Sequence, residues 1–500
     1  MGTGLEPLLT AFGEISDLGR ARALLAWDER TQMPAGGAAI RAEQLATLTR
    51  LRHELLAGDR LGRLIEAAES GLGSQPRDSF EASLVRVAAR EWEKARRVPA
   101  DLRAETARVT SIAEHAWERA REESDFVAFL PHLERVLELQ RRYIECFEAD
   151  HPYDPLLDDF EPGMRTAELR PLLAAVRVGA LELVAEIGAS RIELEDSCLF
   201  GEFELPDQAA LARAVAGSLP LESNAWRLDQ TVHPFAVGIG ISDLRITTRF
   251  DPAYIGTSLW SVIHEVGHAL YQNGIAPELE RTPLCRSASL GFDESQSRMW
   301  ENWVGRGRPF MARLLELLRA DFPARFESLD PESLYRAANR VEPSLIRVEA
   351  DEVTYNLHIV LRFELELELI EGRLAPADLP QAWAARVQEY LGLEVPDDAR
   401  GVLQDVHWAA GSFGYFPTYA LGNVIAGQLW ELAQAETAGL DGLLATGNLE
   451  ALRRLMAKRV YRHGGKLEPA ELIERVVGGP LDPAPLLGYL RAKFGELYGL

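Results

Sequence analysis

Two histidines and the glutamate between them, in His264-Glu-Val-Gly-His268, are the residues best suited to chemistry. On a helix, residues four apart lie on one face, so both imidazoles can reach a single metal ion. Neutral imidazole is a good ligand for zinc. Glu265 is rotated by about 100° from His264, which places it beside the ion, where a base for metal-activated water is needed. The motif therefore predicts a catalytic metal site, against the alternative of a coincidental histidine pair with an exposed glutamate.

A third metal ligand must come from elsewhere in the chain. The metzincin arrangement would place histidine at position 274, where this chain has glycine. A glutamate on a downstream helix is the other option, and Asp293-Glu-Ser-Gln-Ser-Arg-Met-Trp-Glu-Asn302 supplies one. Glu294 is the preferred ligand, and Glu301, two turns further on, is the rival. Three protein ligands leave the fourth position of a tetrahedral ion open, as catalysis requires.

Most of the elements that position these residues are predicted to be helices. Apolar residues recur at helical spacing over residues 1–190 and again over 255–500, the part that contains the two histidines. The intervening residues, about 190–250, are richer in glycine and in short alternating runs. Residues 241–250 alternate well enough to form a strand. No linker separates these parts, so we expect one domain over residues 1–500.

One segment, Phe363-Glu-Leu-Glu-Leu-Glu-Leu369, fits both a strand and a helix. Its strict alternation is typical of a strand. Leucine and glutamate both favour helices, however, and leucines four apart form a row that begins at Leu357. Because no turn residue interrupts the run from Asp351 onward, we predict one long helix.

The composition excludes several classes of function. The 500 residues include 53 Lys+Arg and 77 Asp+Glu, a formal charge of −24, with 47% hydrophobic and 26% charged residues. These proportions are typical of a soluble globular protein and exclude a disordered chain. The excess of negative charge opposes binding to the phosphates of nucleic acids.

The sequence also favours a cytoplasmic protein without a membrane partner. No apolar run approaches the roughly 18–20 residues of a membrane helix. Residues 1–6 lack the basic and apolar regions of a signal peptide. Cys146, Cys198 and Cys285 form no CxxC pair, and we expect them to be buried, reduced thiols.

Further short segments, in order along nearly the whole chain, resemble the carboxypeptidase Taq family of zinc metallocarboxypeptidases. The segments that carry this resemblance, besides the histidine motif, are Trp27-Asp28, Met33-Pro-Ala-Gly-Gly37, Tyr153-Asp-Pro-Leu-Leu157, His233-Pro-Phe235, Asp243-Leu-Arg-Ile-Thr247, residues 294–302, Ile346-Arg-Val-Glu-Ala-Asp-Glu352, Gly401-Val-Leu-Gln-Asp-Val-His-Trp408 and Gly414-Tyr-Phe-Pro-Thr-Tyr419. The chain departs from the family pattern at Asp293, where the family has histidine. What supports the metal ligands at that position is therefore open.

The resemblance implies a role for each residue of the metal site. His264, His268 and Glu294 are implied to bind one Zn²⁺ per chain, or Co²⁺, which the same ligands accept. Glu265 is implied to be the general base that takes a proton from the attacking water and passes it to the leaving amine.

Other residues are implied to bind the substrate. Arg347 is implied to hold the terminal carboxylate of a peptide, a task that suits the guanidinium fork. The alternative that the residues themselves suggest is an ion pair with Asp351 on a helix surface. Arg245 is expected to line the same cleft from the strand.

A histidine and a tyrosine, His407 and Tyr419, are implied to donate hydrogen bonds to the oxyanion of the reaction. They stand twelve residues apart in a segment rich in glycine and aromatic residues. Tyr415 is the alternative to Tyr419, and the alternative role for His407 and Tyr419 is that of core residues.

The resemblance further implies the fold and the activity. The fold is mainly α, a two-lobed helical zincin-type fold around a deep active-site cleft, with a small β-sheet. The implied protein is a homodimer that releases C-terminal amino acids from peptides with a free C-terminus. One alternative is an endo-oligopeptidase with the same zinc site, which would not need Arg347. The other is a non-catalytic acidic helical scaffold with a structural zinc.

Overall fold

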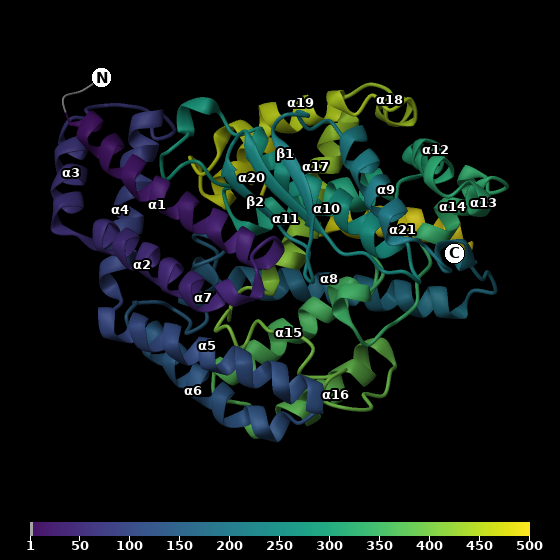
Figure 1. Cartoon of the computed structure of the whole chain (residues 1–500), viewed down its shortest axis with the longest axis horizontal. Helices are drawn as coiled ribbons and strands as arrows, with labels where there is room; N and C mark the ends of the chain where they lie inside the picture. Colours follow the sequence, from purple (N-terminus) through teal and green to yellow (C-terminus); the bar gives the residue numbers. More distant parts are fainter. Residues whose placement is uncertain (1–3) are drawn as a thin grey trace. The chain divides into compact units, whose positions relative to one another are not determined.

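A computed structural model describes residues 4–500 of the chain, and its secondary structure is predominantly helical (Figure 1). The mainly α prediction is therefore confirmed. Residues 1–3, which belong to the segment where we expect no signal peptide, lie outside the described residues. Within the described range, no helix combines the length and the apolar content that crossing a bilayer requires.

The chain folds into two compact units, and each unit combines three separate stretches of sequence. The first unit consists of Met1–Arg96, Glu195–Ala338 and Leu429–Pro480. The second unit consists of Arg97–Leu194, Asn339–Gln428 and Leu481–Leu500.

The first unit holds most of the helices and the only sheet of the described residues. Its helices are α1 (Leu5–Thr31), α2 (Ala38–Ala57), α3 (Asp59–Ser70), α4 (Phe80–Arg97), α9 (Leu205–Ser218), α10 (Gly256–Asn273), α11 (Leu290–Arg298), α12 (Met311–Asp321), α13 (Pro323–Phe326), α14 (Pro331–Ala338), α18 (Leu440–Ala445), α19 (Glu450–Arg459) and α20 (Pro469–Val477). A π-helical segment, Met299–Gly305, continues α11.

Three short strands form the sheet in the order β1-β3-β2. They are β1 (Trp226–Gln230), β2 (Ala236–Gly240) and β3 (Asp243–Thr248). The central strand β3 is parallel to β1 and antiparallel to β2, and both β2 and β3 contact α10 (Figure 1). The strand predicted over residues 241–250 is therefore confirmed as β3, and the sheet packs against the helix that carries the two histidines.

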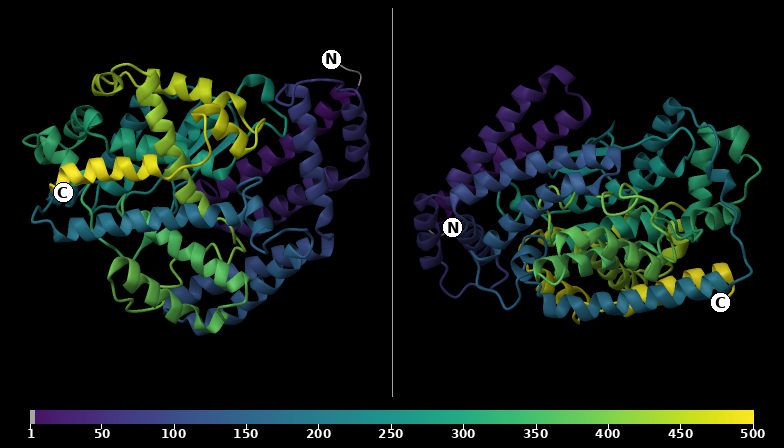
Figure 2. Two further views of the ribbon diagram at one scale, coloured as in Figure 1. Left: turned by 180° about the vertical axis from the view of Figure 1, so that it is seen from behind. Right: turned by 90° about the horizontal axis from the view of Figure 1, so that it is seen from below.

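The second unit contains helices and irregular segments but no strand among its described residues. Its helices are α5 (Ala100–Glu123), α6 (Phe126–Ile144), α7 (Asp154–Asp158), α8 (Thr166–Ala189), α15 (Tyr355–Ile370), α16 (Leu379–Leu391) and α21 (Ala484–Tyr498). Helix α17 (Pro417–Glu436) begins in this unit and ends in the first. Figure 2 shows α8 and α21 running alongside each other, and α8 also contacts α15.

The ambiguous segment over residues 363–369 lies within α15, which confirms the helix prediction, although the helix begins at Tyr355 rather than Asp351. Asp351 precedes the helix and accepts hydrogen bonds from the backbone N–H groups of Val353 and Thr354, at 2.9 and 3.0 Å. Nearly every residue of α15 is buried, glutamate Glu366 included. Burial on all sides explains why the apolar residues of α15 extend beyond the row of leucines four apart.

The three cysteines are free thiols, as expected, but each is half-buried rather than buried.

Candidate metal centre and substrate-binding cluster

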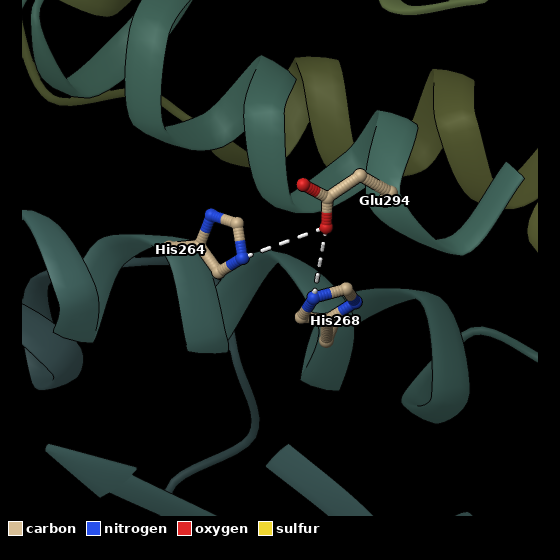
Figure 3. A group of neighbouring side chains, drawn as sticks. All are labelled: His264, His268 and Glu294. Carbon is tan, nitrogen blue, oxygen red and sulfur yellow. Dashed lines mark ion pairs between the residues drawn. The ribbon is translucent and has the colours of Figure 1, made fainter. Parts of the chain in front are cut away.

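Three side chains of the first unit converge on one point (Figure 3). His264 Nε2 and His268 Nε2 lie 3.6 and 3.5 Å from the same oxygen, Oε2 of Glu294. Two ligand atoms that are each about 2.0–2.1 Å from one tetrahedral ion stand roughly 3.4 Å apart. The three residues therefore fit a divalent metal ion, and their separations need little adjustment to bind it.

A close approach between two helix backbones brings the ligands together. A Cβ atom at Gly267, on α10, would lie 2.5 Å from the Cα of Ser297 and 2.6 Å from the carbonyl oxygen of Gln296, both on α11. Only glycine leaves room for this contact. Because Gly267 lies next to His268, the contact sets the separation between the histidines and Glu294.

Two further carboxylates orient the histidines. Glu301 Oε2 lies 3.0 Å from Nδ1 of His264, and Asp293 Oδ2 lies 2.8 Å from Nδ1 of His268. Each imidazole thus has a carboxylate at its Nδ1, and its Nε2 faces Glu294. Asp293 therefore supports His268 directly. Glu301, the rival third ligand, contacts the other ring nitrogen of His264, Nδ1. It is not one of the three residues that converge.

Glu294 is buried and remains ionised. Its Oε1 accepts a hydrogen bond from Nε of Arg298 at 2.7 Å, and its Oε2 accepts one from the Ser297 hydroxyl at 2.9 Å. Burial alone would raise the pKa of Glu294, but the positive charge of Arg298 and the neighbouring histidines hold that pKa well below its usual range. An anionic oxygen is thus available to a metal ion.

Glu265 differs from Glu294 in its electrostatics, although both carboxyl groups are buried. Burial raises the pKa of Glu265, and the nearby His264 and His268 offset only part of that rise. A carboxylate with a raised pKa is well matched to accepting a proton and giving it back at neutral pH.

The second unit contains a buried cluster in which two guanidinium groups share one carboxylate. Arg347 donates from Nε and Nη2 to Oδ1 of Asp405, at 3.1 and 2.8 Å. Arg362 donates from Nε to Oδ2 of the same residue at 2.7 Å. The two arginines hold the pKa of Asp405 far below its usual range, although burial opposes this. The cluster thus carries one more positive charge than this carboxylate neutralises.

The alternative for Arg347, a surface ion pair with Asp351, is wrong. Arg347 is buried, in the short 3-10 turn Arg347–Glu349, and its ion pair is with Asp405. The remaining nitrogen Nη1 lies 3.3 Å from the hydroxyl of Tyr355. Nη1 is therefore the guanidinium nitrogen that Asp405 does not engage, and it donates to this hydroxyl.

His407 and Tyr419 lie next to this cluster. Nε2 of His407 is 3.4 Å from the hydroxyl of Tyr419, and the Arg347 guanidinium carbon lies 4.9 Å from the Tyr419 ring centre. Burial lowers the pKa of His407 to about 4, so the imidazole is neutral at neutral pH. The ring of Tyr415 packs against His407, with centroids 5.2 Å apart. The structure thus brings His407, Tyr419 and Arg347 together.

Arg245 lies on β3 in the first unit, and its guanidinium is engaged by a neighbour on the same strand. Its Nε and Nη2 donate to the two carboxylate oxygens of Asp243, at 2.8 and 3.1 Å. The guanidinium also stacks on Trp27, with its carbon 4.7 Å from the ring centre. Arg245 thus has its Nε and Nη2 paired with a carboxylate, as Arg347 does.

Sequence reasoning missed two members of the buried cluster, Asp405 and Arg362. Asp405 stands two residues before His407, but no spacing marks it as the partner of arginines 43 and 58 residues away. A signal for Arg362 was present, because an arginine inside the otherwise apolar run that begins at Leu357 must find a buried partner.

Comparison with known proteins assigns the whole chain to a group of peptidases. The family profile described as "Carboxypeptidase Taq (M32) metallopeptidase" matches residues 8–494. The "Thermostable carboxypeptidase 1" of Thermus thermophilus is 41% identical over 504 residues, which covers 99% of each chain. The "Carboxypeptidase 1" of Bacillus subtilis is 36% identical and covers 97% of this chain and 96% of its own.

Solved structures agree with these sequence relatives. The crystal structure of an M32 carboxypeptidase from Deinococcus radiodurans R1 superposes with a TM-score of 0.96 at 38% identity, over 100% of both chains. A structure of a carboxypeptidase from Pyrococcus furiosus superposes with a TM-score of 0.95 at 31% identity, over 99% of both chains.

Proposed function

Because the chain belongs to the carboxypeptidase Taq (M32) family of metallopeptidases, a family of metal-dependent carboxypeptidases, we propose how its residues divide the work of removing C-terminal amino acids from peptides. His264, His268 and Glu294 hold the divalent ion. When bound, such an ion supplies Lewis acidity, which acidifies water and polarises the scissile carbonyl. The observation that carries this proposal is the convergence of Nε2, Nε2 and Oε2 at 3.5–3.6 Å beside a buried Glu265.

The proposed ion is zinc, with cobalt as an acceptable substitute. Two imidazoles and one carboxylate suit zinc and similar transition metals, whereas magnesium and calcium prefer all-oxygen ligands. Metal analysis of the purified protein tests this choice. A predominance of magnesium would contradict it.

Glu265 is the proposed general base. Its carboxylate takes a proton from the attacking water and returns it to the nitrogen of the departing amino acid. The raised pKa supports both transfers, because a strongly acidic carboxylate would take the proton poorly.

Arg347 is proposed to bind the C-terminal carboxylate of the peptide. The excess positive charge of the Arg347–Arg362–Asp405 cluster supports this role, because a substrate carboxylate would complete its charge balance. Its Nη1 is the nitrogen that Asp405 does not occupy. Arg245 is a second candidate for contact with the substrate, and its Nε and Nη2 are paired with Asp243.

His407 and Tyr419 are proposed to donate hydrogen bonds to the negative charge that develops on the carbonyl oxygen. A neutral imidazole and a phenol each offer one donor and add no permanent charge. The short distance between the two side chains supports a shared target. Tyr415, whose ring also contacts His407, is the alternative donor.

The proposal also includes a homodimer, which rests on the family resemblance, and a cytoplasmic location, which the three free cysteines support. Light scattering during size-exclusion chromatography measures the mass of the assembly directly. A mass near 55.5 kDa, that of one chain, would contradict the dimer.

Digestion of a mixed peptide library, followed by mass spectrometry before and after chelation, tests the activity as a whole. We expect stepwise loss of single C-terminal residues, which stops on chelation and returns with zinc. Cleavage inside peptides would favour the endo-oligopeptidase instead. Tightly held metal without any hydrolysis would favour the scaffold.

A further inference from the structure

Glu366, on α15, is a fully buried carboxylate that accepts three hydrogen bonds. Its Oε1 accepts one from Nε1 of Trp408 at 2.8 Å. Its Oε2 accepts one from the backbone N–H of Gly414 at 3.1 Å and one from the hydroxyl of Tyr153 at 2.5 Å. All four residues belong to the second unit. The metal centre does not involve Glu366, so its role requires a separate explanation.

Two of the three donors lie on one irregular segment, residues 401–416, which forms turns but no helix or strand. Much of this segment is buried. Without a regular ladder of backbone hydrogen bonds, such a segment must be held by side chains. Gln140 provides one such contact, donating to the carbonyl oxygen of Gly411 at 3.0 Å. Glu366 provides two, at positions six residues apart.

The two contact points of Glu366 adjoin the residues proposed for oxyanion binding. Trp408 directly follows His407. Gly414 has φ = +86°, and a Cβ atom there would lie 2.6 Å from the carbonyl oxygen of Leu156. This turn, confined between Leu156 and Glu366, leads into α17, whose first turn carries Tyr419.

We propose that Glu366 is a positioning residue, which fixes His407 and Tyr419 relative to each other by binding the segment at Trp408 and at Gly414. The inference rests on the proposed function of that pair. Glu366 acts through the segment, since its carboxylate contacts neither side chain.

The ionised form of Glu366 suits this task. Burial raises its pKa to about 7, and the hydrogen bonds from Tyr153, Trp408 and Gly414 oppose that rise. A carboxylate can accept on both oxygens at once. A glutamine of the same shape presents an NH₂ group in place of one oxygen, and this group faces a donor. Glu366→Gln therefore breaks at least one of the contacts without leaving a cavity.

The test compares the kinetics of Glu366→Gln with those of Glu364→Gln. Glu364, two residues earlier on α15, accepts hydrogen bonds from Tyr390 and Arg177 and does not contact the segment. We expect Glu366→Gln to lower kcat about 10²-fold, a typical result of misplacing catalytic groups by about 1 Å. KM should change by less than about threefold and metal content should stay constant. Glu364→Gln should keep a kcat close to wild type.

Two single-hydrogen-bond variants keep the test informative if Glu366→Gln folds poorly. Trp408→Phe and Tyr153→Phe each remove one donor to the same carboxylate. Only Trp408 lies on the segment, so Trp408→Phe should lower kcat and Tyr153→Phe should lower it much less. Equal losses would overturn the inference, because they would show a general effect on the buried carboxylate.

A double-mutant cycle separates this inference from the proposed function. If Glu366 acts through Tyr419, then Glu366→Gln should cost little more once Tyr419→Phe is present. Additive losses would overturn the positioning role while leaving the function of Tyr419 intact. If Tyr419→Phe and His407→Gln both retain wild-type kcat, the proposed function of the pair fails, and the positioning role fails with it.

Discussion

Replacing the C-terminal carboxylate of a peptide with an amide removes the charge that Arg347 is proposed to bind. The loss should depend on how completely the protein itself pairs the guanidinium. A wholly unpaired buried cation would cost about 3–5 kcal/mol. Asp405 keeps Nε and Nη2 of Arg347 paired, however, at 3.1 and 2.8 Å. The amide therefore does not leave the guanidinium wholly unpaired.

The expected loss is therefore that of one hydrogen bond to a charged group, about 1.5–3 kcal/mol. At about 1.4 kcal/mol per tenfold, kcat/KM for the amide should be about 10- to 150-fold below that for the free acid. The assay compares the two forms of one peptide under the same conditions, with the released amino acid or amino acid amide quantified by mass spectrometry.

Two variants test whether contact with Arg347 causes the difference. Arg347→Met and Arg362→Met each remove one of the two guanidinium groups on Asp405, but only Arg347 is proposed to touch the substrate. We expect Arg347→Met to cleave acid and amide at similar rates. Arg362→Met should keep the preference for the acid. The ratio of the two rates is insensitive to partial unfolding, which lowers both rates equally.

Three results would refute this reasoning. Equal cleavage of acid and amide by the wild type would remove the carboxylate-binding role altogether. Loss of discrimination in both variants would show that the net charge of the cluster matters rather than contact with Arg347. A persistent preference in Arg347→Met would assign the carboxylate to another cation, with Arg245 the first to test.

Four more predictions concern the remaining site residues. Glu265→Gln should keep its metal and lose about 10²–10⁴-fold in turnover, and near-normal turnover would remove Glu265 from the mechanism. Glu294→Ala should lose the metal outright, whereas Glu301→Gln should weaken metal affinity about 10–100-fold in a chelator competition; the reverse order would exchange their roles. Tyr419→Phe should lower kcat about 10²–10³-fold with little change in KM, and a wild-type kcat would exclude it as an oxyanion donor. His407 should contribute a fall in the free energy of unfolding, measured by urea titration, as the pH drops from 6.5 toward 4, because its pKa is about 4 in the folded protein and the unfolded chain takes up the proton first. His407→Gln should reduce this pH dependence, and an unchanged dependence would assign it to other groups.

The sequence was sufficient to predict the features that depend on interactions between residues close together in the chain. Residues four apart meet on a helix whatever surrounds them, so His264 and His268 could be paired from their spacing alone. The helix over residues 363–369 follows from the intrinsic preferences of leucine and glutamate, and α15 confirms it. The predominance of helices follows in the same way from periodicity along the chain.

Only the tertiary structure decided which distant groups meet. Gly267 brings the backbone of α11 against α10, and this contact makes Glu294 the residue that converges with both histidines while Glu301 lies behind His264. The sequence favoured Glu294 but left Glu301 as its rival, because both glutamates lie on the same predicted helix. Asp293 likewise acquired a partner, His268, only in the folded chain.

The buried arginine cluster depended most strongly on tertiary structure. A local rule paired Arg347 with Asp351, yet Arg347 lies in a short turn before α15 and binds Asp405, 58 residues away. Each unit is also assembled from three separate stretches of chain, so neighbours in space are often remote in sequence. Periodicity and propensity describe a residue's nearest neighbours along the chain, whereas the partner of a buried charge is set by the packing of whole helices.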